Sequence, residues 1–387
     1  MISPVPNTHP QTAAWLRKTK AKQPSKMPPA AILRAATIVA SLFRFADADA
    51  AMQAAEPAKG ATKQIDLGGG TTLEVIYLPP GDFLMGSTPE ERAWATGIEG
   101  GATPGTTREK PEGDPRSTRI KNGLWMGRTE VSVGQFRRFT EESGYVSDAE
   151  KHGGETQCFD PAWNGYRLTT KVVHPWKSMA GKSWRDPNFN FPMREDFPVV
   201  CVSWNDGRAF CAWLTKRERD AGRLPDGWEY RLPSEAEWEY GCRGGRERAI
   251  FWWGDEFEEG EGRLNISAID FLPGRRKTWP LAKAPWSDGF AFVSPVDHYG
   301  ERGRNGFGLA DMCGGVWEIV LDHFDPQGAH EEPFFVTKDR RPACRGGNYF
   351  DVPGNARCAV RLGLRGPGYS DSRDGFRICL GRHVAVP

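Results

Sequence analysis

Glycine and proline are the residues that most restrict what this chain can fold into. The sequence holds 45 glycines and 30 prolines among 387 residues, together with 15 tryptophans. Helices and strands tolerate few glycines and prolines, turns require them, and large aromatic side chains fill the uneven core of an irregular fold. Because 39% of the residues are hydrophobic, the chain can still bury a sizeable core. We therefore predict an ordered, loop-rich protein with a modest content of helix and strand.

The charge balance and the spacing of metal-binding residue types exclude several functions. The 51 lysines and arginines balance 50 acidic residues, which leaves a formal charge of +1. Binding to a phosphate backbone needs a strong basic excess, so nucleic acid is not an expected partner. None of the eight cysteines forms a CxxC pair, which argues against zinc-ribbon and thioredoxin chemistry.

The first 60 residues differ from the rest of the chain. A basic stretch, the apolar run 35–43 and the small-residue segment 46–51 follow one another in the order of a signal peptide. Arg34 and Arg44 bracket the apolar run and make it shorter than the ~20 residues that a membrane-spanning helix needs. We predict an N-terminal tail (1–60) with an export signal, and hence a periplasmic or extracellular protein. A mis-assigned start, with Met27 as the initiator, is the alternative.

Residues 65–382 are expected to form a single, monomeric domain. The segment 71–78 is rich in β-forming residues and predicts a strand. Three segments place apolar residues at helical spacing, the first two after Ser132 and Asn205 as capping residues: 131–140, 205–214 and 233–240. Two charged stretches are expected to be solvated loops: 88–119 and 255–261. Five tryptophans are interpreted as packing anchors: Trp204, Trp238, Trp252, Trp253 and Trp317.

Nine separated segments fall in one register: 80–86, 128–132, 198–206, 231–240, 243–245, 305–309, 315–318, 345–348 and 375–377. In this order they resemble the formylglycine-generating enzyme (sulfatase-modifying factor) family over residues 65–382. The resemblance implies an α+β fold of the C-type-lectin-like superfamily, loop-rich and low in regular secondary structure, with bound calcium as a structural cofactor at two sites. The guanidinium groups of Arg231 and Arg377, in two of these segments, are interpreted as donors to loop carbonyls.

Calcium takes six to eight oxygen ligands, and two stretches supply them in the pattern that the resemblance implies. The first combines side-chain oxygens of Asn265 and Asp288 with the carbonyls of Ile266 and Phe290. The second combines carboxylates of Asp311 and Glu318 with the carbonyls of Gly314 and Val316, completed by Glu130. Asp311 stands where the family often has Asn, and Gly315 replaces a usual Asn. The alternative is that Asn265 and Asp288 cap turns and that Glu318 forms a buried ion pair.

The catalytic pattern of the family is broken in this chain. Formylglycine-generating enzymes bind copper(I) through two cysteines in the segment after the Gly-Gly pair, because copper(I) prefers soft thiolates. Here Asp351 stands at the first of these positions, Asn348 replaces the usual serine, and no cysteine occurs between Gly346 and Arg357. Copper is therefore not an expected cofactor. Asn348, Asp351 and Arg361 are candidates for a polar cluster in a groove with Trp317 as a wall.

The resemblance also implies disulfides. Cys242 and Cys358 match a bonded pair of the family, and Cys211 and Cys379 resemble a second bridge, although Cys379 lies one residue later than expected.

Three functions follow from these observations. The first is a divergent family member that uses a retained groove for an oxidation other than formylglycine generation. The second is a non-catalytic binding module of the C-type-lectin-like type, whose partner is a peptide or small molecule. The third, formylglycine generation for sulfatases, is disfavoured because the catalytic cysteines are absent.

Overall fold

The computed structural model describes residues 56–101, 111–151, 155–160, 175–268, 284–336 and 340–386. The chain divides into two units, residues 1–56 and 57–387, and every element described below belongs to the second. The predicted export signal lies outside the described residues. Within the described part, no helix is both long and apolar enough to cross a bilayer.

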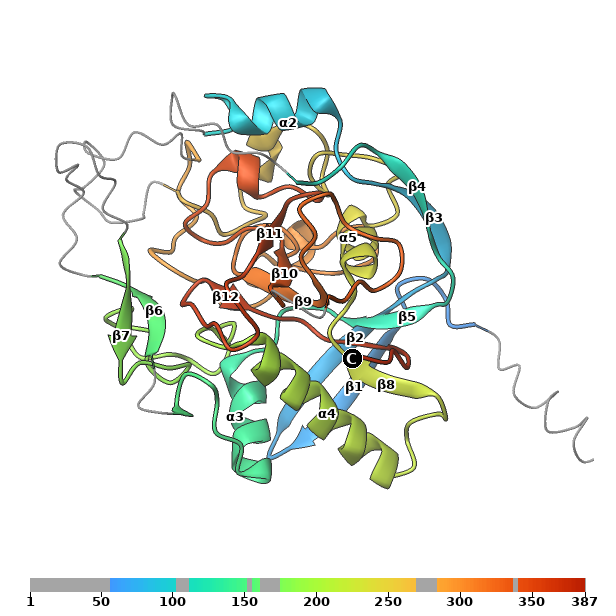
Figure 1. Ribbon diagram of the computed structural model, residues 1–387, viewed down its shortest axis with the longest axis vertical. Helices are drawn as coiled ribbons and strands as arrows, with labels where there is room; N and C mark the ends of the chain where they lie inside the picture. The colour runs from blue at the N-terminus through green and yellow to red at the C-terminus, as the bar shows by residue number, and fades with distance from the viewer. Residues whose placement is uncertain are drawn as a thin grey trace, which may run out of the picture. The chain divides into compact units, whose positions relative to one another are not determined.

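A five-stranded antiparallel sheet supports one side of the domain (Figure 1). Its order is β1-β2-β5-β13-β8, so the last strand of the chain lies between two earlier ones. The strands are β1 (Thr62–Gly68), β2 (Thr71–Leu78), β5 (Leu124–Gly127), β13 (Cys379–Arg382) and β8 (Trp228–Arg231). The strand predicted at 71–78 is confirmed as β2.

A four-stranded sheet of order β11-β10-β9-β12 lies at the centre of the view in Figure 1 and positions the candidate site. Its strands are β9 (Trp317–His323), β10 (Pro342–Arg345), β11 (Arg361–Gly363) and β12 (Asp374–Gly375). Two-stranded ribbons add β3 (Gly81–Met85) with β4 (Arg116–Ile120), and β6 (Glu155–Phe159) with β7 (Trp176–Ala180).

Four α-helices are present in the described residues: α2 (Pro89–Thr96), α3 (Val133–Ser143), α4 (Trp204–Asp220) and α5 (Glu235–Arg243). Three 3-10 turns add η2 (Phe257–Gly260), η3 (Gly300–Gly303) and η4 (Pro353–Asn355). The helices predicted at 131–140, 205–214 and 233–240 are confirmed as α3, α4 and α5, with Ser132 as the cap of α3. The predicted cap Asn205 was wrong. Ser203 caps α4, because its side chain accepts from the Asp206 backbone N–H while the Asp206 side chain accepts from the Ser203 backbone N–H.

The core consists of two aromatic-rich clusters. One packs α3 and α4 around side chains such as Phe136 and Phe210, and the other surrounds Trp238 and Phe251 beside α5. All five tryptophans interpreted as packing anchors are at most 6% exposed, which confirms that interpretation. The chain thus fills an irregular fold with large rings rather than with regular layers.

The prediction that 88–119 is a solvated loop was wrong. This stretch contains α2 and β4, and it buries Glu91 and Glu112. Both carboxylates bond to the guanidinium group of Arg357, which is fully buried. Arg357 lies about 250 positions later in the sequence, so no local pattern could reveal the pairing. In the other charged stretch, 255–261, the acidic side chains are exposed as predicted, while Phe257 is buried against Trp286.

Candidate functional site

The loop 345–358 between β10 and β11 carries the position at which the family resemblance implies a catalytic thiol. There the carboxylate of Asp351 accepts hydrogen bonds from the Asn348 backbone N–H (3.1 Å) and the Asn348 side-chain amide (2.7 Å). It also accepts one from the amide of Asn355 (2.6 Å). The Asn348 side-chain oxygen in turn accepts from the Phe350 backbone N–H (2.7 Å). Asp351 is thus the centre of a network that holds its own loop in shape.

Two other candidates, Arg361 and Trp317, have different surroundings. The Arg361 guanidinium forms a two-point ion pair with Glu235 (3.0 and 2.6 Å) and donates to the carbonyls of Pro111 and Asp325. Trp317 is 6% exposed in β9. The structure therefore brings Asn348 and Asp351 together, while Arg361 ties β11 to the start of α5.

Sequence reasoning missed a second acidic group beside this loop. Asp374, in β12, is 3% exposed, and its Oδ2 atom has no hydrogen-bond partner within the described residues. Burial and the neighbouring charge of Asp371 raise the pKa of Asp374 well above its ordinary value, against the opposing charge of Arg373; the charge of Asp351 adds a smaller raising effect. The only sequence signal was the acidic segment 371–374 directly before the matched segment 375–377.

Aromatic and cationic side chains adjoin the same loop. The rings of Trp176 and Phe350 meet edge to face at 4.4 Å, and the Arg373 guanidinium lies 4.3 Å from the Trp176 ring centre. Arg373 also pairs with Asp371 while keeping 29% of its side chain exposed. This surface therefore offers a ring edge and a partly exposed cation next to Asp351.

The second calcium-type segment gathers three buried carboxylates around a small cavity. Glu130 and Asp311 line the cavity with Asn265, and Glu318 lies close enough for its charge to act on both. The Glu130 Oε2 atom has no hydrogen-bond partner in the part of the chain that the structure describes. Asp311 accepts from the Asp297 backbone N–H (2.6 Å).

Burial and the repulsion among these carboxylates raise the pKa values of Glu130 and Asp311. Burial, followed by the charges of Asp311 and Glu318, raises the pKa of Glu130 well above its ordinary value. Burial likewise raises the pKa of Asp311 to about 7, although Arg377 and the backbone of Asp297 oppose the shift. Without a cation, Glu130 and Asp311 therefore retain their protons to higher pH than ordinary carboxyl groups do, because Arg377 alone does not offset their burial and mutual repulsion.

Glu318 also forms the buried ion pair that the alternative interpretation expected. Its two oxygens accept from Arg377 (both 2.6 Å), and Oε2 also accepts from the Trp238 indole (2.7 Å). Arg377 further donates to the carbonyls of Gly127, Arg128 and Ala310, as expected for a donor to loop carbonyls.

Two glycines allow the chain to approach this site. Gly314 has φ +78°, and a Cβ there would lie 2.2 Å from the Asn265 carbonyl oxygen. Gly315 has φ +66°, and a Cβ there would lie 2.9 Å from Glu130 Oε1. Gly315, where the family usually has Asn, is therefore the residue that admits the Glu130 carboxylate. With an orphaned carboxylate oxygen and three acids, the donor set fits a hard cation such as calcium.

The first calcium-type segment is closed by its own hydrogen bonds. Asp288 Oδ2 accepts from the Asn265 amide and from the Ile266 backbone N–H (both 2.9 Å), and Oδ1 accepts from the Phe290 N–H (3.0 Å). The Asn265 side-chain oxygen accepts from Ser294 (3.3 Å). The structure brings all four predicted residues together, but in the turn-capping arrangement, so this segment fits a cation less clearly than the second does.

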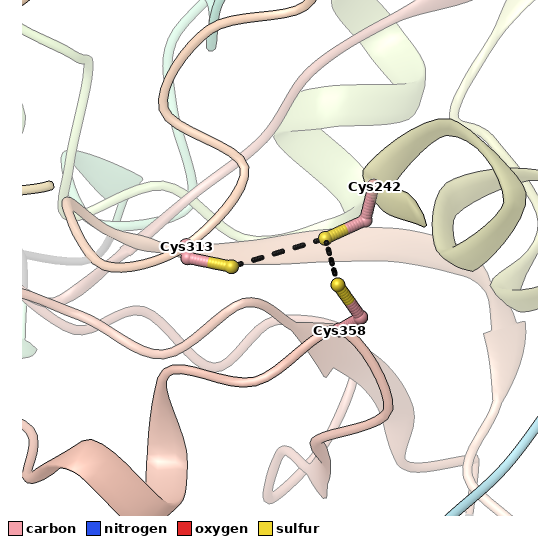
Figure 2. Close-up of side chains that lie close together, drawn as sticks. All are labelled: Cys242, Cys313 and Cys358. Atoms are coloured by element: carbon pink, nitrogen blue, oxygen red, sulfur yellow. Dashed lines mark hydrogen bonds between the residues drawn. The ribbon is translucent and has the colours of Figure 1, made fainter. Parts of the chain in front are cut away.

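Three buried cysteines meet in the second hydrophobic cluster (Figure 2). The Cys242 sulfur lies 3.3 Å from that of Cys358 and 3.9 Å from that of Cys313. All three are free thiols, so the predicted Cys242–Cys358 bridge remains a prediction. Burial opposes ionisation at Cys358, but hydrogen bonds from the two other thiols and the charge of Arg243 outweigh it and hold its pKa well below the ordinary value.

Cys211 and Cys379 are also buried free thiols. The Cys379 sulfur accepts a hydrogen bond from Arg231 (3.1 Å), whose guanidinium also pairs with Glu237. As interpreted from the sequence, Arg231 donates to loop carbonyls, here those of Leu232 and Arg382.

Comparison with known proteins decides the family. The sulfatase-modifying factor enzyme 1-like domain matches residues 67–381. The chain belongs to this family. It is 29% identical over 325 residues to the formylglycine-generating enzyme of Mus musculus, covering 80% of this chain and 76% of that one. It is equally similar, 29% over 329 residues, to the inactive C-alpha-formylglycine-generating enzyme 2 of Bos taurus, covering 82% and 91%.

The fold agrees with this membership. PvdO from Pseudomonas aeruginosa superposes with a TM-score of 0.56 at 21% identity, covering 83% of this chain and 98% of that chain. The predicted α+β, loop-rich fold of the sulfatase-modifying factor family is confirmed. The chain is thus equally similar to a protein named as a generator of formylglycine and to a protein named inactive.

Proposed function

We propose that this protein is a divergent family member that does not generate formylglycine and binds a peptide or small molecule on the face around Asp351. The observation that carries the proposal is the Asp351 network. A carboxylate cannot supply a copper(I) thiolate, and here it accepts three hydrogen bonds from Asn348 and Asn355. The loop is thereby held as a rigid support for a binding surface rather than as a reactive segment.

The chemistry of the adjoining side chains indicates what such a surface binds. Phe350 offers a half-buried apolar ring that packs on the buried Trp176, and Arg373 adds a partly exposed positive charge. An aromatic ring edge beside a guanidinium suits a ligand with an apolar group next to a carboxylate or a peptide carbonyl. The sequence alternative of a binding module is therefore the one that the geometry favours.

We further propose that calcium is a structural cofactor of this protein. Glu130 and Asp311 would hold it in the second segment, with Glu318 and the carbonyls of Gly314 and Val316 beside it. The unpartnered Glu130 oxygen and the surplus of buried carboxylates support this assignment. A bound calcium would neutralise the repulsion among these acids and fix the loop that leads into β9.

Oxygen consumption and peptide selection test the binding proposal together. The purified protein, with and without added copper, is incubated with a cysteine-containing sulfatase-motif peptide while dissolved oxygen is recorded. No oxygen uptake and no formylglycine product are expected. Phage-displayed random peptides are then selected on the immobilised protein, and the binders are measured against Arg373→Ala and the distant control Lys216→Ala.

Selected peptides are expected to lose about tenfold in affinity in Arg373→Ala, equivalent to ~1.4 kcal/mol, and nothing in Lys216→Ala. Copper-dependent turnover of the sulfatase peptide would contradict the proposal. So would a selection whose peptides bind both variants as well as the native protein.

A second candidate is an oxidation other than formylglycine generation, and one observation favours it. Asp374 holds an unpartnered, fully buried carboxylate oxygen near Asp351, in the region where the resemblance implies the family's chemistry. Two nearby carboxylates are a donor set for a hard, redox-active cation. The metal content of the protein as purified is compared with that of Asp374→Asn. A redox-active metal that the native protein holds and the variant loses supports the oxidation, because binding alone needs no metal at Asp374.

We also propose that the protein is exported as a monomer. The N-terminal order of basic, apolar and small residues supports export. Determination of the mature N-terminus by mass spectrometry, with light scattering of the same sample, tests both statements. An intact Met1 in the mature protein, or a stable dimer, would contradict them.

A further inference from the structure

The three-cysteine cluster of Cys242, Cys313 and Cys358 has the dimensions of a metal site. Two sulfur–sulfur distances are 3.3 and 3.9 Å, and all three sulfurs lie within 4.8 Å of one another. A metal ion bound at ~2.3 Å from each sulfur spaces thiolates by roughly 3.8–4.0 Å. The thiols therefore need to move only by fractions of an ångström to ligate one ion, as the convergence of their side chains in Figure 2 illustrates.

The cluster is built from three separate parts of the fold. Cys242 lies in the last turn of α5, Cys313 precedes β9, and Cys358 follows η4 in the loop 345–358. Each is at most 1% exposed. A site made from three rigid segments is pre-organised, because its ligands are held in place by packing rather than by the ion alone.

One guanidinium group and one backbone N–H adjoin the sulfurs. The Trp252 backbone N–H points to the Cys313 sulfur, and the Arg243 guanidinium acts on Cys358. Arg243 is itself buried and paired with Glu239 (2.6 Å), which fixes its position. These donors offset part of the negative charge that three thiolates bring into an apolar cluster.

We propose that Cys242, Cys313 and Cys358 bind one thiophilic metal ion, and that copper(I) is the ion they hold most tightly. Soft thiolates select copper(I) and zinc, and zinc sites complete a tetrahedron with a fourth ligand. Among the described residues, no fourth His, Cys, Asp or Glu joins the three sulfurs. Three sulfurs without a fourth ligand suit copper(I). Binding displaces the thiol protons to solvent.

This site is distinct from the Asp351 face and does not depend on its function. It also competes with the Cys242–Cys358 disulfide that the family resemblance implies, because a disulfide removes two of the three ligands. Substitution of Cys313 distinguishes the metal site from the disulfide, because Cys313 is a ligand of the metal but takes no part in a Cys242–Cys358 bridge. Cys313 also lines the small cavity at Glu130 and Asp311, so the cluster borders on space inside the domain.

Copper(I) titration tests the proposal on the full-length protein. The protein is purified without chelator, reduced, desalted under nitrogen and titrated with copper(I) against a colorimetric copper(I) chelator. One equivalent is expected to bind. Cys313→Ala is expected to weaken binding by roughly a hundredfold or more, since one of three metal–sulfur bonds is lost. Cys344→Ala removes a buried thiol outside the cluster and serves as the matched control.

A parallel titration with zinc and a count of reactive thiols in the denatured protein complete the test. Eight reactive thiols in the protein as purified are expected. Cys313→Ser keeps the size of the side chain and replaces the alanine variant if that variant melts early. Six reactive thiols with a mapped Cys242–Cys358 bridge, copper(I) binding unchanged in both Cys313 variants, or tighter binding of zinc than of copper(I) would each overturn the proposal.

Discussion

The loop 345–358 and the cavity at Glu130 and Asp311 differ in how far their buried polar groups are paired. In the loop, Asp351 accepts three hydrogen bonds, and Arg345 and Arg357 pair with buried glutamates. At the cavity, acids outnumber the one neighbouring guanidinium, and an oxygen of Glu130 has no partner among the described residues. The Asp351 carboxylate of the loop is satisfied by the chain's own donors, whereas the Glu130 carboxylate at the cavity has an oxygen that a cation would satisfy. The family resemblance alone would place a metal in the loop, because the copper-binding cysteines of the family occur there.

The largest expected effect is on the anchoring of the loop. Arg357→Met leaves Glu91 and Glu112 buried without their cation, which is expected to lower the free energy of unfolding by about 3–5 kcal/mol. Urea denaturation at pH 7.5 measures it. The control Arg119→Met changes an exposed arginine and is expected to shift stability by less than ~0.5 kcal/mol. Equal stabilities of the two variants would show that the loop does not depend on these ion pairs.

The ion pairs of Arg357 with Glu91 and Glu112 also predict that the stability of the protein depends on pH. Arg357 makes two hydrogen bonds with Glu112 and one with Glu91. Burial, and the charge of Glu112, raise the pKa of Glu91 to about 7 against the pull of Arg357. The folded state therefore keeps a proton that the unfolded state releases near its ordinary pKa of 4.5. Stability is expected to fall as the pH rises through the interval from 4.5 to about 7, and to fall no further from this cause above it.

Glu91→Gln removes this contribution. Between pH 4.5 and pH 8, the difference in unfolding free energy between the native protein and the variant is expected to change by about 3 kcal/mol at most. Urea melts at several pH values measure it, with the exposed Glu258→Gln as the control. Parallel curves for the native protein and Glu91→Gln would mean that Glu91 stays ionised in the folded state.

Calcium is expected to act on the cavity and not on the loop. A ligand at a hundredfold excess over its Kd stabilises the native state by about 2.7 kcal/mol, so a chelator should lower the melting temperature. Asp311→Ala is expected to lose most of this response, and Asp351→Ala to keep it. Differential scanning calorimetry with calcium and with EDTA compares the three proteins. If EDTA lowers the melting temperature of the native protein but not that of Asp351→Ala, calcium acts on the loop and not on the cavity.

A smaller effect is expected from the Asp351 network itself. Asp351→Ala leaves the donors of Asn348 and Asn355 without their acceptor, at a cost of about 1–2 kcal/mol. Chemical denaturation measures it. Asp220→Ala, which changes an exposed residue in α4, should cost less than ~0.5 kcal/mol. If Asp351→Ala is as silent as that control, Asp351 is a passive loop residue.

The smallest expected effect changes sign with calcium. In EDTA, Glu130→Gln removes a buried carboxyl group whose ionisation is opposed by burial and by the neighbouring acids, and is expected to stabilise the protein by about 1 kcal/mol or less. With calcium present, the same variant is expected to be less stable than the native protein because a ligand charge is lost. Melting curves in both buffers show whether the order reverses, and an unchanged order would remove Glu130 from the calcium site.

The sequence predicted the parts of the fold that depend on local patterns. The β2 strand, the α3, α4 and α5 helices and the buried tryptophans follow from residue spacing and capping, and the structure confirms them. The matched segments also identified the family. These features could be predicted because each is determined by residues within a few positions of one another.

Long-range pairings could not be predicted in this way. The burial of Glu91 and Glu112 depends on Arg357, and the convergence of Cys313 on Cys242 depends on how α5 packs against β9 and β10. A charged stretch has the same sequence pattern whether its side chains are solvated or pair with a guanidinium group far away in the sequence. For the same reason, Asp374 was missed and the ion pair of Arg361 with Glu235 was not anticipated.

The place of β13 has a consequence for how the protein is made. Residues 379–382 pair with β8, and residues 379–380 also pair with β5, so these two strands each lack a neighbour until the ribosome has delivered the final part of the domain. An incomplete nascent chain carries two open strand edges and cannot close its largest sheet. The five-stranded sheet can therefore close only after residues 379–382 have been synthesised. Delayed closure of its largest sheet would help a chain to pass unfolded through a translocation channel, as the export proposed from the N-terminal pattern requires.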